Sequence, residues 1–464
     1  MIKNIFRVLF ANGLVAVVGL ISSLLLPKIL HIDDYATFQS FTLYLSYIAV
    51  LHLGFPTGMN IKYAGKSIET IDKSRYRAEV RLLLIILSFF TIVGCSIYLV
   101  TRQTMLLYIS AMIFLYGFVG SFALLMQSWS KFKAYSLLHI LMSAVPLALP
   151  IAFYAVFRWI SAGLCIQSYI LVFGITSLAC MIYHGRIVAG VKSAKVFSRD
   201  NWDVEKLGFF FLLGNYINSL FHSIDKQFVK WFCETSEFSY YSFGLTMQST
   251  MTIFITAVSH PLFPYMASGK IQGKEQYTRV KRWLLMLGSM SGLACFACSL
   301  VVKHWIPNYI DSIPVIRVYF AVFPAMAVIS CLCFNLYKIR KMTKRYIIDL
   351  SVMLALAAIA NFIAIKLGYG YIGVAFATTL LNYIWLVYET YVFKELRLNL
   401  REIFFIIAFL VEFFTVPLIK SVILGALVFV VCDLLLCFVC FSSEIDLLFH
   451  RVLIKLRMRR SVKG

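Results

Sequence analysis

Charged residues are scarce in this chain of 464 residues, because Asp, Glu, Lys and Arg make up only 14% of it, against 61% hydrophobic residues. A soluble globule of this composition would expose large apolar patches, which favour association or aggregation. Long polar segments are also missing, since the longest loops hold about twenty residues, too few to fold as a domain. The chain is therefore no soluble globular protein, and a glycosyltransferase or polysaccharide polymerase with a large external domain is disfavoured.

Motifs for nucleotide, zinc or nucleophile chemistry are absent. The sequence contains no GxxxxGK[ST] loop, no HExxH helix and no GxSxG elbow. Two CxxC pairs occur, Cys295/Cys298 and Cys437/Cys440, but neither has a histidine or a second pair in a polar loop. We therefore expect no catalytic residue, no metal and no cofactor, and interpret the cysteines as small apolar packing residues.

What the chain does have is about 14 apolar stretches, each long enough to cross a bilayer core of about 30 Å. They run over residues 6–30, 36–61, 82–101, 105–129, 136–157, 160–183, 207–232, 239–266, 283–302, 312–337, 345–366, 371–393, 403–419 and 421–441. The first lacks a small-residue cleavage pattern, so we interpret it as a retained helix. Because lipid offers the backbone no hydrogen bonds, the sequence predicts an all-α polytopic membrane protein.

Basic residues outnumber acidic ones by 43 to 21, which gives a net charge of +22. Most of them fall in alternate gaps between the apolar stretches or near the termini, at residues 3–7, 62–81, 131–133, 186–206, 270–282, 338–345, 394–401 and from 451 onward. The positive-inside rule places these gaps and both termini in the cytoplasm. The excess charge is thus interpreted as a topology signal beside anionic lipid headgroups, and we expect no nucleic-acid partner.

The two halves of the chain share a weak repeat. The matching positions are Asp33 with Glu237, Gly65 and Lys66 with Gly269 and Lys270, and Arg75 and Arg77 with Arg279 and Lys281. An even number of spans separates the copies, so the repeats would have the same orientation in the membrane. Prolines that remove a backbone donor and favour kinks lie in or beside the spans: Pro27, Pro56, Pro146, Pro150, Pro261, Pro264, Pro324 and Pro417.

Four segments carry a family resemblance: NIFRVLFANGLVAVVGLISSLLLPKIL, LHLGFPTGMNIKYAGK, HSIDKQFVKWFCETSEFSYYSFG and SHPLFPYMASGK. They resemble the polysaccharide-transporter branch of the multidrug/oligosaccharidyl-lipid/polysaccharide (MOP) exporter superfamily, which includes O-antigen and capsule-repeat flippases. The resemblance implies two six-helix lobes, residues 1–200 and 201–400, around a central cavity as in MATE-like transporters. It also implies two added helices over residues 401–442. Independently of the resemblance, the alternation of apolar and basic residues after Glu444 predicts a cytoplasmic basic amphipathic tail over residues 443–464.

The same resemblance implies a function. The substrate would be an oligosaccharide on undecaprenyl pyrophosphate, moved from the cytoplasmic to the outer leaflet of the bacterial inner membrane by alternating access. Coupling to an H⁺ or Na⁺ gradient, and contact with membrane lipids, a polysaccharide polymerase and a chain-length regulator, are further expectations. Two alternatives stay open: an ion-coupled organic-cation or multidrug antiporter of the same fold, and a membrane-bound glycosyl- or acyltransferase.

Ionisable side chains at membrane depth are unfavourable by at least about 2.5 kcal/mol, so they should face a cavity or a partner. In the seventh stretch, Lys226 and Lys230 share a helical face with Asn218 and His222 and would bind pyrophosphate. Other candidate cations are Arg7, Lys28, Lys62 and Arg317. Asp225, His222 and Glu412 are candidates for ion coupling or helix pairing, and Asn12, Asn215 and Asn218 for polar cavity lining. Asp433, like Glu412, lies in one of the last two stretches, where it would pair with a cation of a neighbouring helix or lie at a subunit contact.

Overall fold

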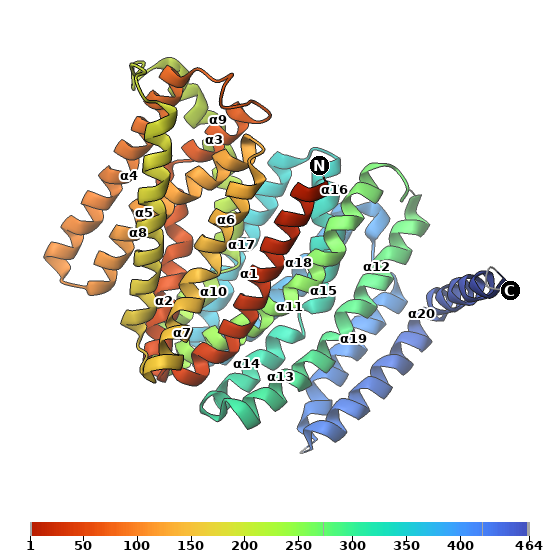
Figure 1. The fold of residues 1–464 in the computed structure, drawn as a ribbon. Coiled ribbons are helices and arrows are strands. Elements are labelled where there is room, and N and C mark those ends of the chain that lie inside the picture. Colours follow the sequence, from red (N-terminus) through yellow and green to blue (C-terminus); the bar gives the residue numbers. More distant parts are fainter. Residues whose placement is uncertain (1, 272, 420, 462–464) are drawn as a thin grey trace. The chain divides into compact units, whose positions relative to one another are not determined.

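A computed structural model describes residues 2–271, 273–419 and 421–461. Every regular element in these ranges is a helix, as Figure 1 shows, and the predicted all-α class is confirmed. The chain divides into two compact units, residues 1–230 and residues 231–464. The lobes inferred from the resemblance, 1–200 and 201–400, and their central cavity stay predictions, as does the amphipathic tail, whose side chains from residue 447 onward lie outside the description.

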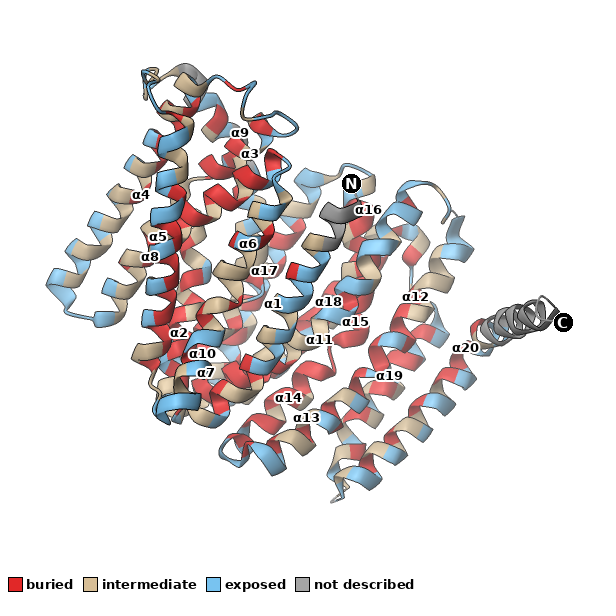
Figure 2. Ribbon diagram, in the orientation of Figure 1, coloured by how far each residue is buried: buried red, intermediate tan, exposed pale blue. Residues whose placement is uncertain are grey.

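Unit 1 is built around α5, which packs against α3, α4, α6 and α8. Large side chains such as Met112, Phe118 and Phe122 are buried along α5, and Figure 2 shows the buried residues along this helix. The elements of unit 1 are α1 (Ile2–Ile29), α2 (Ile32–Tyr47), η1 (Ile48–His52), α3 (Phe55–Tyr63), α4 (Lys73–Thr101), α5 (Thr104–Ser128), α6 (Phe132–Ser143), α7 (Val145–Phe157), α8 (Ala162–Ile187), α9 (Arg199–Phe221) and α10 (Ile224–Phe232).

Unit 2 has its core in the segment from α14 to α16, where nearly all side chains are buried (Figure 2). This segment packs against α11, α12, α13 and α18. The elements of unit 2 are α11 (Thr235–Ala267), α12 (Gly273–Ser289), α13 (Ser291–Trp305), η2 (Pro307–Ser312), α14 (Ile313–Phe320), α15 (Phe323–Val328), η3 (Ile329–Cys333), α16 (Phe334–Ile339), α17 (Thr343–Lys366), α18 (Gly370–Val392), η4 (Lys394–Leu396), α19 (Leu400–Thr415), η5 (Val416–Leu418) and α20 (Val422–Ser461).

All the predicted apolar stretches fold as helices. Among the described residues, eight helices are long and apolar enough to cross a membrane, and eleven spans result if each of three sharply bent pairs is one crossing. The remaining predicted spans correspond to α9 with α10, to α11 and to α19, which are helical but less apolar or shorter. Large apolar side chains on the outer face of α4, such as Phe89, Ile92 and Leu99, are exposed as a lipid-facing surface requires. The protein is a multi-pass membrane protein.

Several bends coincide with prolines that the sequence singled out. Pro56, Pro146 and Pro324 lie in the first turns of α3, α7 and α15, directly after a break, and Pro417 lies in the short η5. Proline has no backbone N–H, and in the first turn of a helix that N–H would have no partner within the helix. Pro27, Pro150, Pro261 and Pro264 lie inside helices that continue through them.

Candidate functional site

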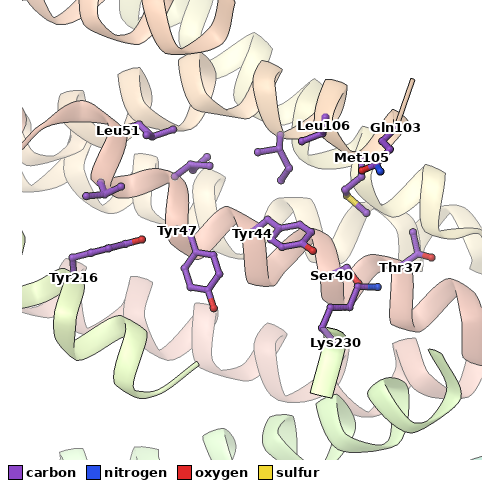
Figure 3. Close-up of a pocket in the computed structure, with 13 residues that line it drawn as sticks. Thr37, Ser40, Tyr44, Tyr47, Leu51, Gln103, Met105, Leu106, Tyr216 and Lys230 are labelled. Atoms are coloured by element: carbon purple, nitrogen blue, oxygen red, sulfur yellow. The ribbon is translucent and has the colours of Figure 1, made fainter. Parts of the chain in front are cut away.

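A groove of about 560 Å³ opens in unit 1 along one face of α2 and η1. The lining residues on this face recur every three or four positions, which places them in one row on a helix. Figure 3 shows Lys230 and Ser40 toward one end, Tyr44 and Tyr47 in the middle, and Tyr216 and Leu51 at the other end. The lining residues are Thr37, Ser40, Tyr44, Tyr47, Ile48, Val50, Leu51, Gln103, Met105, Leu106, Ile109, Tyr216 and Lys230.

The groove is elongated and changes character along its length. From Thr37 to Leu51 it follows the helix for about 20 Å, at about 1.5 Å per residue. The polar and cationic side chains Thr37, Gln103 and Lys230 lie at one end, and tyrosines follow them (Figure 3). Most of these side chains are half-buried or exposed, so a ligand has access to them.

A bend after η1 ends the groove. Leu53 and Gly54 adopt left-handed conformations, with φ of 52° and 80°, and α3 leaves at 62° to the preceding helix pair. Glycine takes such a conformation at little cost, whereas a residue with a side chain at Leu53 is strained there. The bend turns α3 toward α9.

The helices α3 and α9 cross with their backbones in contact. A Cβ atom on Gly208 of α9 would lie 2.0 Å from the carbonyl oxygen of Gly54, and one on Gly58 would lie 2.0 Å from that of Val204. Only glycine permits this approach, as in other small-residue helix crossings in membranes. The crossing positions α9 so that Tyr216, about two turns further along, contributes to the groove.

The seventh apolar stretch is not one continuous helix, contrary to the sequence analysis. The α9 helix ends at Phe221 and α10 begins at Ile224. Between them the Ser223 hydroxyl donates to the carbonyl of Ser219 at 2.9 Å, and the Ser223 amide donates to that of Leu220. The serine thus competes for carbonyls near the end of the helix. The expected stripe is therefore interrupted between His222 and Lys226.

The two lysines of α10 both reach toward α2. The Lys226 ammonium donates to Gln39 Oε1 of α2 at 2.7 Å. Lys230 lies one turn further along α10 and lines the groove beside Ser40 (Figure 3). Asp225 is buried, and its carboxylate accepts the backbone N–H of Lys226 at 2.7 Å, a position where the helix dipole favours negative charge.

The polar residues of α9 divide into exposed and buried positions. Asn215 and His222 are exposed. Asn218 Oδ1 is buried, and it has no hydrogen-bond partner in the part of the chain that the structure describes. Asn12 on α1 is exposed, Arg7 is half-buried, and Lys28 is exposed in the last turn of α1.

Lys62 lies elsewhere in unit 1. Its ammonium forms an ion pair with Glu79 of α4, whose side chain is fully buried. The Tyr63 hydroxyl donates to the other carboxylate oxygen at 2.7 Å. Lys62 is therefore engaged at the α3–α4 contact, away from the residues that line the groove.

Arg317 and Glu412 belong to unit 2. Arg317 shares a cavity of about 20 Å³ with Lys303 and residues of the α19–α20 connection. Glu412 lines an apolar groove on the surface of α19, and its buried Oε1 has no hydrogen-bond partner among the described residues. Asp433 accepts a hydrogen bond from Ser289 at 3.1 Å.

Sequence reasoning did not single out the tyrosines and hydroxyls of the groove. Tyr44 and Tyr47 are three residues apart in an apolar span, and that spacing is the one signal in the sequence that points to a shared face. Tyr216 reaches them through the glycine crossing of α3 and α9, which depends on contacts between distant segments.

No protein-family model matches the chain, and a search among curated proteins finds no match. The chain is similar to a solved structure of the lipid II flippase MurJ in an inward closed conformation, with a TM-score of 0.65 and 14% identity over 94% of this chain and 99% of that one.

The chain is also similar to a multidrug resistance MATE family transporter of the MOP superfamily in an inward-facing conformation. The TM-score is 0.54 and the identity 12%, over 83% of this chain and 94% of that one. At these identities the likeness concerns the fold. The protein accordingly has the MOP fold, as the resemblance predicts.

Proposed function

We propose that the protein is a flippase of the polysaccharide-transporter type, which moves polyprenyl-pyrophosphate-linked oligosaccharides from the cytoplasmic to the outer leaflet. The MOP fold supports a carrier without covalent chemistry, and the similar MurJ structure is described as a lipid II flippase. In this proposal the carrier works by alternating access in a bacterial inner membrane, draws on an H⁺ or Na⁺ gradient, and delivers its product to a polymerase and a chain-length regulator.

The observation that carries the proposal is the polar contact between α10 and α2. The Lys226 ammonium donates to Gln39 Oε1 of α2 at 2.7 Å, which places a positive charge at the contact of the two helices, where the pyrophosphate would bind. A pyrophosphate that loses hydration inside the protein requires such compensation. One turn away, Lys230 opens onto a groove that is long enough for several sugar rings.

The groove chemistry favours an oligosaccharide over an organic cation. A cation carrier of the same fold would require carboxylates in its site, whereas the charged side chain among the described lining residues is that of Lys230. The remaining lining combines hydroxyls with tyrosine rings. These rings suit the apolar faces of sugars, and each adds a polar hydroxyl.

The test is leaflet-resolved translocation by the purified full-length protein in proteoliposomes. An undecaprenyl-pyrophosphate-linked oligosaccharide is placed in both leaflets, and an enzyme outside the vesicles oxidises the accessible sugar. We expect more than half of the substrate to become accessible with the wild-type protein and about half without it. No difference between these two preparations would overturn the proposal.

Substitution of Lys226 connects the activity with the site. Lys226→Ala should slow translocation at least tenfold at unchanged protein abundance, because the phosphate loses its counter-charge, and Lys226→Arg should retain part of the rate. Wild-type rates for Lys226→Ala would remove this residue from the site.

A further inference from the structure

Building on the proposed function, we propose that the groove along α2 is the sugar site and that Lys230 selects a repeat unit with a carboxylate-bearing sugar. The carboxylate of a uronic acid would lie at the Lys230 end, and neutral sugars would follow along the tyrosines. Three features of the groove support this assignment: the hydrogen-bond donors at one end, the positive charge of Lys230, and the row of tyrosines along the rest of its length.

The Lys230 end offers the hydrogen bonds that a carboxylate sugar needs. Lys230 is half-buried and faces the groove, with Thr37 and Gln103 lining the same end (Figure 3). These three side chains supply donors to carboxylate oxygens. The Ser40 hydroxyl already donates to the Ala36 carbonyl at 2.8 Å, so its oxygen remains as an acceptor for a sugar hydroxyl.

The charge at this end matches a monoanion. Lys230 contributes one positive charge, and the other described lining residues are neutral. A pyrophosphate diester carries more negative charge than one ammonium compensates, and the excess would lose its hydration in the groove. Lys226 lies one turn, about 6 Å, along α10 and meets α2 at Gln39 instead. The two lysines would therefore bind different groups of one substrate: Lys226 the pyrophosphate, and Lys230 the carboxylate of the sugar.

The rest of the groove accommodates uncharged rings. Tyr44, Tyr47 and Tyr216 line its middle and far end (Figure 3), over a length of about 20 Å along α2 and η1. The Tyr47 hydroxyl lies 3.5 Å from the Ser223 carbonyl, at the break between α9 and α10. Through this contact, the tyrosine-lined part of the groove meets the segment that leads into α10, which carries both lysines.

The experiment measures sugar binding without translocation, by saturation-transfer difference NMR on the full-length protein in nanodiscs. The probes are methyl β-glucuronide and methyl β-glucoside at equal concentration, which differ only in the carboxylate. We expect the glucuronide to bind about tenfold more tightly, the effect of one charge-assisted hydrogen bond. Lys230→Gln should remove this preference and leave the glucoside signal unchanged, and Tyr44→Leu should weaken both signals. Lys303→Gln, an exposed lysine of α13 in unit 2, is the matched control and should change neither.

Equal signals from the two sugars in the wild-type protein, or a preference that survives in Lys230→Gln, would overturn the inference. Displacement of the glucuronide by pyrophosphate in the Lys226→Ala variant would also overturn it, because Lys230 would then be the phosphate site. The translocation assay decides the proposed function separately. Translocation without a preference for the glucuronide would contradict only this inference. A preference for the glucuronide without translocation would contradict the proposed flippase function.

Discussion

At the scale of single residues, the partner of a cation decides what the cation does. Lys62 and Lys226 are both basic residues beside or within apolar spans, and the sequence assigns both to phosphate binding. The structure gives Lys62 a fully buried carboxylate, Glu79, that also accepts from Tyr63, and gives Lys226 the neutral amide of Gln39. We infer that Lys62 stabilises the α3–α4 contact, while Lys226 places a positive charge where α10 meets α2, at the proposed phosphate site.

This inference predicts how Lys62 substitutions behave. Lys62→Met should destabilise the protein by about 3–5 kcal/mol, because it leaves the Glu79 carboxylate buried without its cation. Adding Glu79→Gln removes the charge, keeps an acceptor for Tyr63 and should restore most of the stability. Thermal unfolding of the purified variants measures both effects.

The translocation rate of the same double variant distinguishes the two roles of Lys62. Near-wild-type translocation together with restored stability supports the structural role. A stable double variant that fails to translocate would instead return Lys62 to the phosphate site.

At the scale of helices, the sequence predicts where the chain is helical better than where helices break. The average hydropathy of a span is insensitive to a local break, so residues 36–61 and 207–232 each read as one helix. Pro56, Pro146 and Pro324 indicate three of the breaks because proline removes a donor. Ser223 offers no comparable signal, since serine is common in unbroken helices, and its effect depends on the hydroxyl turning back to the Ser219 carbonyl. The groove was not predictable from the sequence either, because it depends on two local features together: the bend after η1 and the crossing of α3 and α9.

The crossing of α3 and α9 predicts that Gly208 is intolerant of any side chain. Gly208→Ala places a Cβ 2.0 Å from the Gly54 carbonyl oxygen, so the helices must separate, at a cost of about 1–3 kcal/mol. Gly174→Ala in α8 is the matched control, because its Cβ meets no atom within 4 Å and alanine favours a helix. We expect a lower melting temperature for Gly208→Ala than for Gly174→Ala, and the reverse order would contradict the backbone contact.

At the scale of the whole molecule, the sequence repeat corresponds to shared local structure in each unit. Arg77 of α4 donates to the Val191 carbonyl, in the segment after α8. Its counterpart Lys281 of α12 donates to the carbonyls of Leu396 and Arg397, in the segment after α18, at 2.9 and 2.8 Å. Gly65 and Gly269 likewise both have positive φ, 76° and 71°, just after a helix. These repeated basic residues therefore have a structural role as tethers in addition to any effect on topology.

The last two helices form a hairpin whose two open ends both meet the middle of α12. Glu402, at the start of α19, pairs with buried Lys281 at 2.7 Å, and Glu444, late in α20, pairs with the neighbouring Arg282. The rings of Phe405 and Phe441 lie 4.8 Å apart near this end. The rings of Phe413 and Phe429 lie 6.0 Å apart further along, as antiparallel packing requires. We infer that α19 and α20 cross the membrane as a pair, although α19 has only 16 residues.

The hairpin makes the location of the termini a test of the span count. With about 14 crossings both termini face the cytoplasm, whereas an odd count such as eleven puts them on opposite sides. In spheroplasts, from which the outer membrane has been removed, epitope tags at each terminus should be accessible to antibody only after lysis, and a control tag in the loop 158–161 should be accessible before lysis. A C-terminal tag that is accessible on unlysed spheroplasts, with an N-terminal tag that is not, would require an odd count. If α19 and α20 cross as a pair they contribute an even number, and the error would then lie in the α9–α10 pair or in α11, the other two predicted spans that hydropathy supports least.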